Sequence, residues 1–346
     1  MLEARIIYAR AACVRQLVLS PGIRFSIARG GRRTLCKLRL IRVKIRGIHT
    51  CVIVQMKPNG PEVEIKTLDG GFGAEIIGVD LANLQRNRES VSVLESAFLD
   101  HRVVAVRDQQ LDVNDIVAVS RCFGPLEPHV LDRFHHPKTP LVLVLSNRVD
   151  EEGRAMGLKD AGSFWHSDVS FKQRPAKATL LYALEVPEEG GDTLFCDMIS
   201  AYDAVSARLK QKLEGLTAVH DYANRDRVAH RTGTKPRLDA GNLSRVPPVR
   251  HPVVRRHPVT GRKALYVNPT YTVCIEGMDA VESEALLKEI FDHCLDRRFQ
   301  MRYRWRPKDV VIWDNAAVMH AATTQNLDPS KHRTLWRTII VGGPTS

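Results

Sequence analysis

The stretch Phe164-Trp165-His166-Ser167-Asp168-Val169 combines strand-forming aromatic and branched residues with two side chains that bind metals, a histidine and an aspartate. An extended strand alternates its side chains between two faces, so His166 and Asp168 would project from the same face. One further histidine brought alongside would complete a set of two histidines and one carboxylate. Such a set holds a six-coordinate metal through three protein ligands and leaves three positions open.

The candidate for the third ligand is His320, far downstream in Asp314-Asn315-Ala316-Ala317-Val318-Met319-His320. Together the three residues would form the facial triad that is typical of non-heme Fe(II) oxygenases. A His-x-Asp triplet also occurs by chance, and by itself it is more often a strand histidine hydrogen-bonded to a nearby carboxylate. The surrounding sequence therefore has to decide between a metal site and an ordinary hydrogen bond.

Several further blocks of sequence accompany the triplet in a fixed order. They are FGAEIIGVDL (72–81), RVVAVRDQ (102–109), FGPLEPH (123–129), GGDTLFCDM (190–198), RRHPVTGRKALYVN (255–268) and RTLWR (333–337). Together with the triplet and His320, these blocks resemble the TauD/TfdA family, which includes taurine dioxygenase and 2,4-dichlorophenoxyacetate dioxygenase. The resemblance covers residues 60 to 343, and several ordered blocks are far more specific than any one triplet.

The resemblance implies an Fe(II)- and 2-oxoglutarate-dependent dioxygenase, which uses O2 to oxidise a small substrate and releases succinate and CO2. It also implies that His166, Asp168 and His320 are the catalytic metal ligands. Related halogenases have a small residue in place of the carboxylate, so Asp168 favours hydroxylation. Desaturation or epimerisation on the same scaffold is a further possibility that only product analysis separates.

Two residues are implied to bind the distal carboxylate of 2-oxoglutarate. Arg333 aligns with the family arginine in this role, and a guanidinium offers paired donors that match a carboxylate. Thr193, in the Gly-Gly-Asp-Thr block, matches the hydroxyl that accompanies it. The interval from His320 to Arg333 is two residues longer than in the relatives, which affects the loop between them and leaves the Arg-x-x-x-Arg match intact.

The resemblance further implies an anionic substrate. His129 and Arg337 fall where the taurine enzyme binds its sulfonate, and Arg337 shares an even strand spacing with Arg333. Gly162 and Asp132 stand where an amide and an aromatic residue would fit the amine end of taurine. Taurine itself is therefore not expected, whereas a sulfonate, an alkyl sulfate or an aryloxyalkanoate would satisfy both cations.

The fold expected is α+β and mainly β, a jelly roll with flanking helices. Short β-rich runs separated by turn residues predict an antiparallel double sheet, and the family's double-stranded β-helix agrees with this pattern. The clearest runs are 141–145, 178–182 and 310–313, whereas helical spacing marks 92–102, 112–123, 199–216 and 279–295. The polar, turn-rich stretch 222–248 is predicted to be a mobile loop that covers the active site.

Charge divides the chain into a basic extension, residues 1–56, and a dioxygenase domain, residues 57–346. The extension holds 12 Lys and Arg and one acidic residue, Glu3, which leaves 39 basic and 38 acidic residues, or 39 − 38 = +1, beyond it. It could be an arm for a polyanion, an Arg-rich targeting peptide, or sequence translated upstream of a true start at Met56. We favour the last interpretation because the resemblance begins near that point.

Composition limits the remaining possibilities. Seven cysteines without a C-x-x-C pair predict reduced thiols and a cytoplasmic protein, and Cys196 is expected to be a buried apolar filler and not a nucleophile. No apolar run is long enough to span a membrane, and the nearly neutral domain argues against nucleic acid as a partner. We expect a homo-oligomer, either a dimer or a tetramer. The competing hypothesis is a non-catalytic β-helix that binds a metal or ligand and uses the basic arm to hold a polyanion.

Overall fold

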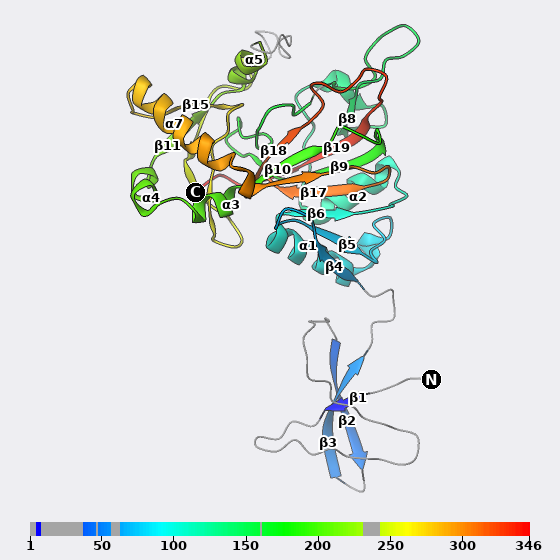
Figure 1. The fold of residues 1–346 in the computed structure, drawn as a ribbon. Helices are drawn as coiled ribbons and strands as arrows, with labels where there is room; N and C mark the ends of the chain where they lie inside the picture. The colour runs from blue at the N-terminus through cyan, green and yellow to red at the C-terminus, as the bar shows by residue number, and fades with distance from the viewer. Residues whose placement is uncertain (1–4, 8–36, 46–47, 57–62, 160, 231–242) are drawn as a thin grey trace. The chain divides into compact units, whose positions relative to one another are not determined.

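The computed structural model describes residues 5–7, 37–45, 48–56, 63–159, 161–230 and 243–346 (Figure 1). The chain divides into two compact units, Met1–Glu62 and Val63–Ser346. The boundary between these units lies six residues after the boundary expected from charge. In the first unit, three antiparallel strands pair in the order β1-β3-β2, with the bounds β1 (Arg5–Ile7), β2 (Lys37–Ile45) and β3 (Ile48–Met56). The second unit is mixed α/β and mainly sheet.

An eight-stranded sheet forms the centre of the second unit (Figure 1). Its strand order is β4-β5-β6-β17-β9-β19-β8-β7, and every pair is antiparallel except β5 with β6. The strands are β4 (Glu64–Thr67), β5 (Ala74–Ile77), β6 (Val103–Val106), β7 (His135–His136), β8 (Thr139–Ser146), β9 (Ala176–Glu185), β17 (Val310–Asp314) and β19 (Thr334–Val341).

Alternation along the strands gives this sheet two buried faces. Leu180 and Ile312 pack in one apolar cluster with helices α1 (Arg88–His101) and α2 (Val113–Phe123). The next residues in each strand, such as Leu181 and Trp313, belong to a second cluster on the opposite face. A period of two is what places neighbours in one strand on opposite sides of a sheet. The helices therefore cover one face and leave the other for the site.

A three-stranded sheet packs against that second face. It has the order β16-β10-β18, with the bounds β10 (Thr193–Asp197), β16 (Gln300–Tyr303) and β18 (Val318–Ala322). The ring of Phe195 in β10 lies 5.5 Å from that of Trp313 in β17, so the two sheets share one core. Because β10 pairs with β18, Phe195 stands directly opposite His320.

A third apolar cluster lies beside the two sheets and is built largely from helices. It joins α3 (Met198–Asp203), α4 (Ala207–Leu213) and α7 (Ala280–Cys294) to a small sheet of order β12-β11-β15 and a hairpin. The remaining elements are β11 (Thr217–His220), α5 (Tyr222–His230), β12 (Val249–Pro252), β13 (Val254–Arg256), β14 (Lys263–Leu265), β15 (Thr272–Ile275), η1 (Leu84–Arg86), η2 (Asp132–Phe134) and η3 (Arg297–Phe299).

Most elements expected from periodicity are present. The runs 141–145, 178–182 and 310–313 lie within β8, β9 and β17, and α1, α2 and α7 cover the expected helices. Asp112 and Asp279 begin α2 and α7 by accepting hydrogen bonds from backbone N–H groups of the first turn, which satisfies donors that a helix start leaves unpaired.

Three local predictions were wrong. The single helix expected over 199–216 is two helices, because Ser206 starts α4 by accepting a hydrogen bond from the N–H of Leu209. The stretch around His166 is not a strand. The first part of the expected loop 222–248 is helix α5, and residues 231–242 of that loop lie outside the described residues.

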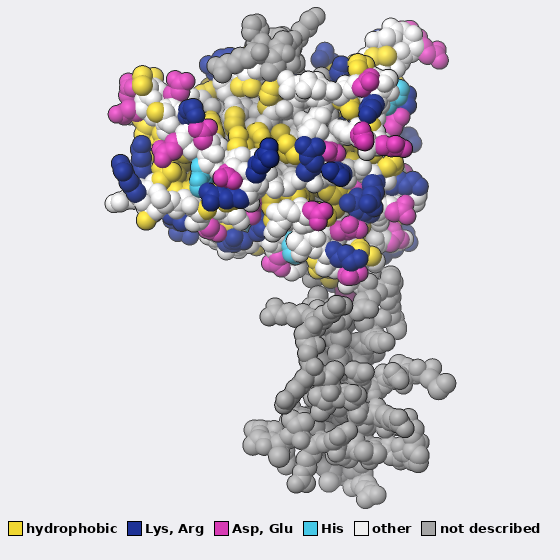
Figure 2. All heavy atoms as spheres, viewed as in Figure 1, with side chains coloured by type: hydrophobic (Ala, Val, Ile, Leu, Met, Phe, Trp, Pro, Cys, Tyr) yellow, Lys and Arg dark blue, Asp and Glu magenta, His cyan; other side chains and the backbone are white. Residues whose placement is uncertain are grey.

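Three observations on the described residues bear on the composition arguments. Acidic and basic side chains are interspersed on the face of the second unit shown in Figure 2. Within the described residues, no helix is both long enough and apolar enough to cross a bilayer. The described cysteines, 122, 196, 274 and 294, are free thiols, and burial raises the pKa of Cys196 well above its usual value, as expected for an inert filler.

Two buried histidines predict acid sensitivity of the fold. Burial lowers the pKa of His220 to about 3 and that of His251 to about 4, with smaller contributions from His251 and Arg255 respectively. Between these folded-state pKa values and the unfolded-state pKa of about 6.5, the unfolded state binds protons that the folded state does not bind. The free energy of unfolding should therefore fall on acidification from pH 6.5 toward pH 4, by up to about 1.4 kcal/mol per pH unit for each histidine.

Urea unfolding at pH 7 and pH 5 checks this expectation. His251→Asn should reduce the loss between the two pH values, whereas exchanging the half-buried His293 for Gln should leave it unchanged. If the free energy of unfolding falls equally between pH 7 and pH 5 in the wild type and in both variants, the acid sensitivity comes from other groups.

Candidate metal centre and cosubstrate site

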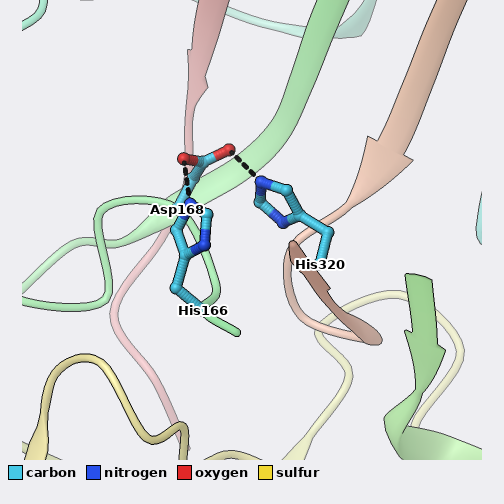
Figure 3. Close-up of side chains that lie close together, drawn as sticks. All are labelled: His166, Asp168 and His320. Carbon is cyan, nitrogen blue, oxygen red and sulfur yellow. Dashed lines mark ion pairs between the residues drawn. The ribbon is translucent and has the colours of Figure 1, made fainter. Parts of the chain in front are cut away.

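His166, Asp168 and His320 converge although His320 comes from a segment far along the chain (Figure 3). His320 lies in β18, and its backbone exchanges two hydrogen bonds with His166, N–H to O at 3.0 and 2.8 Å. This isolated bridge is all the β pairing that His166 makes within the described residues. Asp168 follows in a turn, and Val169 has a φ of 59°, a left-handed value that a branched residue rarely adopts.

The donor atoms of the three side chains fit a single metal ion. All of them lie within 4.8 Å of one another, and all three residues are buried. The Nε2 atoms of His166 and His320 each lie 3.5 Å from one Asp168 carboxylate oxygen. Ligand atoms about 2.1 Å from a metal and at right angles to one another are about 3 Å apart, so a small movement would suffice.

Hydrogen bonds and burial set the protonation of the ligands. His166 Nδ1 lies 2.8 Å from the carbonyl oxygen of Phe164, which only accepts, so Nδ1 carries a hydrogen and Nε2 is the nitrogen that faces Asp168. Burial, followed by the nearby His166, lowers the pKa of His320 to about 3. The two histidines and Arg337 hold the pKa of Asp168 well below its usual value despite burial. The donor set is therefore two imidazoles and one carboxylate that stays ionised.

Arg333 is a buried cation directly before β19. Its Nε donates to the carbonyl oxygen of Gly191 at 2.8 Å, and no ion pair to it is found within the described residues. Burial lowers the pKa of Arg333 to about 10, the nearby Asp192 partly opposing it. A β-carbon at Gly191 would lie 2.9 Å from Arg333 Cδ, so glycine is needed there. Such a cation favours an anionic ligand that it can bind by hydrogen bonds.

Thr193 lies two residues after Gly191, at the start of β10, and is also buried. Its hydroxyl oxygen accepts a hydrogen bond from Nε1 of Trp305 at 3.0 Å. Because that bond uses a lone pair, the hydroxyl hydrogen remains available to another acceptor. The short segment 191–193 thus supplies one contact to Arg333 and one hydroxyl.

His129 and Arg337 line the same cavity as His166 and Asp168. The space between these residues is about 530 Å³, part of which is open to solvent. Arg337 NH1 lies 3.5 Å from Asp168, and its buried Nε has no hydrogen-bond partner within the described residues. Arg333 lines a neighbouring cavity that shares Leu158 and Ala161 with the first.

Three aromatic residues and one arginine are among the residues of the cavity wall that were not predicted from the sequence. Phe171, Tyr222 and Tyr271 form a cluster with ring centroids 4.7 to 6.0 Å apart. The fourth, Arg225, is buried in α5 and pairs with Asp226 at 2.6 Å. Tyr222 and Arg225 lie within the stretch predicted to cover the site, three residues apart on a helix, which is the spacing that puts side chains on one face. Helical spacing was the signal that could have identified this pair.

The two positions that depart from the taurine pattern differ in their placement. Gly162 lines the cavity with a φ of +75°, and a β-carbon there would lie 3.0 Å from Cε1 of His166. Asp132 lies in η2 and is not among the described residues that line the cavity. A side chain at position 162 would therefore crowd the imidazole ring of His166.

Comparison with known proteins identifies the same family that the sequence blocks resemble. The family model for the taurine catabolism dioxygenase TauD, TfdA family matches residues 64–339. The chain is 34% identical over 275 residues to the alpha-ketoglutarate-dependent 2,4-dichlorophenoxyacetate dioxygenase of Cupriavidus pinatubonensis, covering 77% of this chain and 93% of that protein. It is 32% identical over 275 residues to a putative alpha-ketoglutarate-dependent sulfonate dioxygenase of Schizosaccharomyces pombe, covering 78% and 67% respectively.

Solved structures agree. The crystal structure of AAD-2 in complex with Mn(II) and N-oxalylglycine superposes with a TM-score of 0.68 at 27% identity, over 82% of this chain and 99% of that one.

Proposed function

The chain belongs to the taurine catabolism dioxygenase TauD, TfdA family, and on that premise we propose that His166, Asp168 and His320 hold the Fe(II) ion with which it oxidises a small anionic substrate. The protein is a 2-oxoglutarate-dependent dioxygenase, an oxidoreductase that needs 2-oxoglutarate and a metal ion. The observation that carries the residue assignment is the convergence of these three buried donors, two of which, His166 and Asp168, line a cavity.

When bound, Fe(II) and 2-oxoglutarate supply the activation of O2, with succinate and CO2 as the other products. The protein's own side chains bind and orient the reactants. We assign Arg333 and Thr193 to the distal carboxylate of 2-oxoglutarate, supported by the lack of a described ion-pair partner for Arg333 and by the free hydroxyl hydrogen of Thr193. Arg333 supplies charge and two-pronged donors, and Thr193 supplies a single directed hydrogen bond.

We further propose that His129 and Arg337 bind the anionic head group of the substrate. The unpartnered Nε of Arg337 supports this assignment, because a buried donor without an acceptor costs stability that a ligand would restore. The substrate would then lie between this cation and the metal ligands, in the cavity that both line.

Among the anions considered, the cavity wall favours an aryloxyalkanoate. Phe171, Tyr222 and Tyr271 form an aromatic surface on the same cavity as Arg337. An aryl group packed on such rings gains about 0.5–1.5 kcal/mol beyond the burial of its area. Aliphatic sulfonates and alkyl sulfates would satisfy the cations and leave this surface unused.

A panel of sulfonates, alkyl sulfates and aryloxy acids, scored by succinate release under Fe(II), O2 and 2-oxoglutarate, tests the substrate class. We expect aryloxy acids to give the highest kcat/KM. A marked preference for aliphatic sulfonates would contradict the role given to the aromatic wall. Product analysis of the best substrate then separates hydroxylation from desaturation or epimerisation.

Arg333→Lys should raise the KM for 2-oxoglutarate, because a point charge replaces a planar fork of donors. Losing one charge-assisted hydrogen bond costs on the order of 1–3 kcal/mol, which corresponds to about a 5- to 150-fold change. The control is Arg302→Lys, since Arg302 is half exposed and pairs with Asp192 next to Thr193. An unchanged KM in the Arg333 variant would move the role to Arg337 or Lys331.

Several finer points belong to the same proposal. We infer that the two facing sheets form the jelly roll, or double-stranded β-helix, of the family, with helices outside it, since strands β10 and β18 face β17 across one core. A lid function for α5 is supported by Tyr222 and Arg225, which line the cavity. Three points stay predictions: assembly as a dimer or tetramer, a cytoplasmic location, and the origin of residues 1–56. Analytical ultracentrifugation measures the oligomeric state.

A further inference from the structure

A chain of hydrogen bonds behind the metal ligands leads from Trp313 to the Asp168 carboxylate. The hydroxyl of Thr179 lies 2.7 Å from Asp168 Oδ2. The side-chain amide of Asn315 lies 3.0 Å from Thr179 Oγ1, and its oxygen lies 3.1 Å from Trp313 Nε1 and 3.2 Å from the backbone N–H of Asp168. All four residues are buried, so water does not substitute for these bonds.

The donors and acceptors allow only one direction along this chain. Trp313 Nε1 and a backbone N–H only donate, so the Asn315 atom that both approach must be the oxygen. The other end of Asn315 is then its NH2 group, which donates to Thr179 Oγ1. Because that oxygen accepts from Asn315, the hydroxyl hydrogen of Thr179 is directed to Asp168. Asn315 thereby makes Thr179 a donor to the carboxylate.

The turn that carries Asn315 is itself fixed from the other side. Asp314 Oδ2 lies 2.6 Å from His257 Nε2, and Asp314 Oδ1 accepts the N–H of Ala316. His257 Nδ1 accepts the N–H groups of Val259 and Thr260, so its hydrogen is on Nε2 and points to Asp314. Thr179 is held by strand pairing, opposite Trp313 in β17 and Ile339 in β19. The backbone positions of Asn315 and Thr179 are therefore both fixed.

We propose that Thr179, oriented by Asn315, is a positioning residue that fixes the Asp168 carboxylate for metal binding, an inference that rests on the proposed metal site. The bond from Thr179 uses one lone pair of Oδ2 and sets the rotation of the carboxylate about its side chain. A carboxylate held in this way loses less freedom when a metal binds. Groups that orient a metal ligand typically contribute 10- to 100-fold to metal affinity.

The test is the Mn(II) affinity of the whole protein, measured by calorimetry or by the spin resonance signal of free Mn(II). Thr179→Val removes the hydroxyl at nearly constant volume and should weaken Mn(II) binding about 10- to 100-fold. Thr179→Ser keeps the hydroxyl and should bind Mn(II) close to the wild type.

Thr338→Val is a matched control. Thr338 is equally buried, lies in the adjacent strand β19, and bonds to Ser120 Oγ at 2.6 Å in α2, behind the other face of the sheet. Thr338→Val should lower the thermal midpoint of unfolding, as Thr179→Val does, and should leave the Mn(II) affinity unchanged. A role for Thr179 in stability alone would make these two variants behave alike.

The outcomes are distinguishable. Equal Mn(II) affinity in Thr179→Val and the wild type overturns the positioning role and leaves the metal site standing. A folded wild type that does not bind Mn(II) contradicts the metal site itself. If Thr179→Val folds poorly, the pair T179S and T179A, which differ only in the hydroxyl, makes the same comparison, and equal affinities there overturn the proposal.

Discussion

Replacing His166, Asp168 or His320 by Ala should reduce succinate formation to the level seen without enzyme. Each substitution removes one of only three protein ligands from a site in which every donor is buried. The remaining two ligands would bind a metal more weakly and would not define the open positions that 2-oxoglutarate and O2 need. Turnover with added Fe(II), 2-oxoglutarate and an aryloxy acid is the measurement.

The control for these variants is His293→Ala, a histidine that is half buried and hydrogen-bonded to the carbonyl oxygen of Ala201, remote from the site. It should retain activity. Circular dichroism shows whether each variant is folded. A folded variant with full activity would remove that residue from the triad.

The second large effect concerns the charge of the substrate. The neutral amide of a good acid substrate should have a kcat/KM about 10- to 100-fold lower than the acid, because it leaves buried cationic or polar groups unpaired. Arg337→Ala should then lower kcat/KM for the acid far more than for the amide. The exposed Arg154, which pairs with Asp150 and Glu152, offers a matched control for removing an arginine.

Equal kcat/KM for the acid and its amide would contradict anion recognition in this cavity. Arg337 would then be better explained as a second ligand of 2-oxoglutarate, and its alanine variant should raise the KM for that cosubstrate. Because Arg337 also lies 3.5 Å from Asp168, metal affinity must be measured in the same variant.

The convergence of His166, Asp168 and His320 was predictable from sequence, although the expected strand around His166 was wrong. Aromatic and branched residues around His166 favour a strand, yet Val169 turns the chain directly after Asp168. That turn is stabilised by distant residues: Ser170 contacts His220 and Asn268 through its side chain and His251 through its carbonyl oxygen. Local preferences do not contain those contacts. The ligands converge through the bridge to His320 and not through strand alternation.

The aromatic residues of the cavity wall could not be predicted from the sequence. Phe171, Tyr222 and Tyr271 come from three separate segments, and an isolated aromatic residue in a sequence is usually part of a core. Only the fold brings these rings together beside Arg337. By contrast, the helix ends at Asp112 and Asp279 were predictable, because a capping aspartate acts on its own next three residues.

The most direct test of the central claim is the stoichiometry of the reaction with the wild-type protein. With Fe(II), O2, 2-oxoglutarate and the preferred acid, we expect one succinate released for each substrate molecule oxidised, and none when any one of the four is omitted. Substrate or ligand binding without succinate formation, in folded protein that holds its metal, would contradict the account and favour a non-catalytic binding protein.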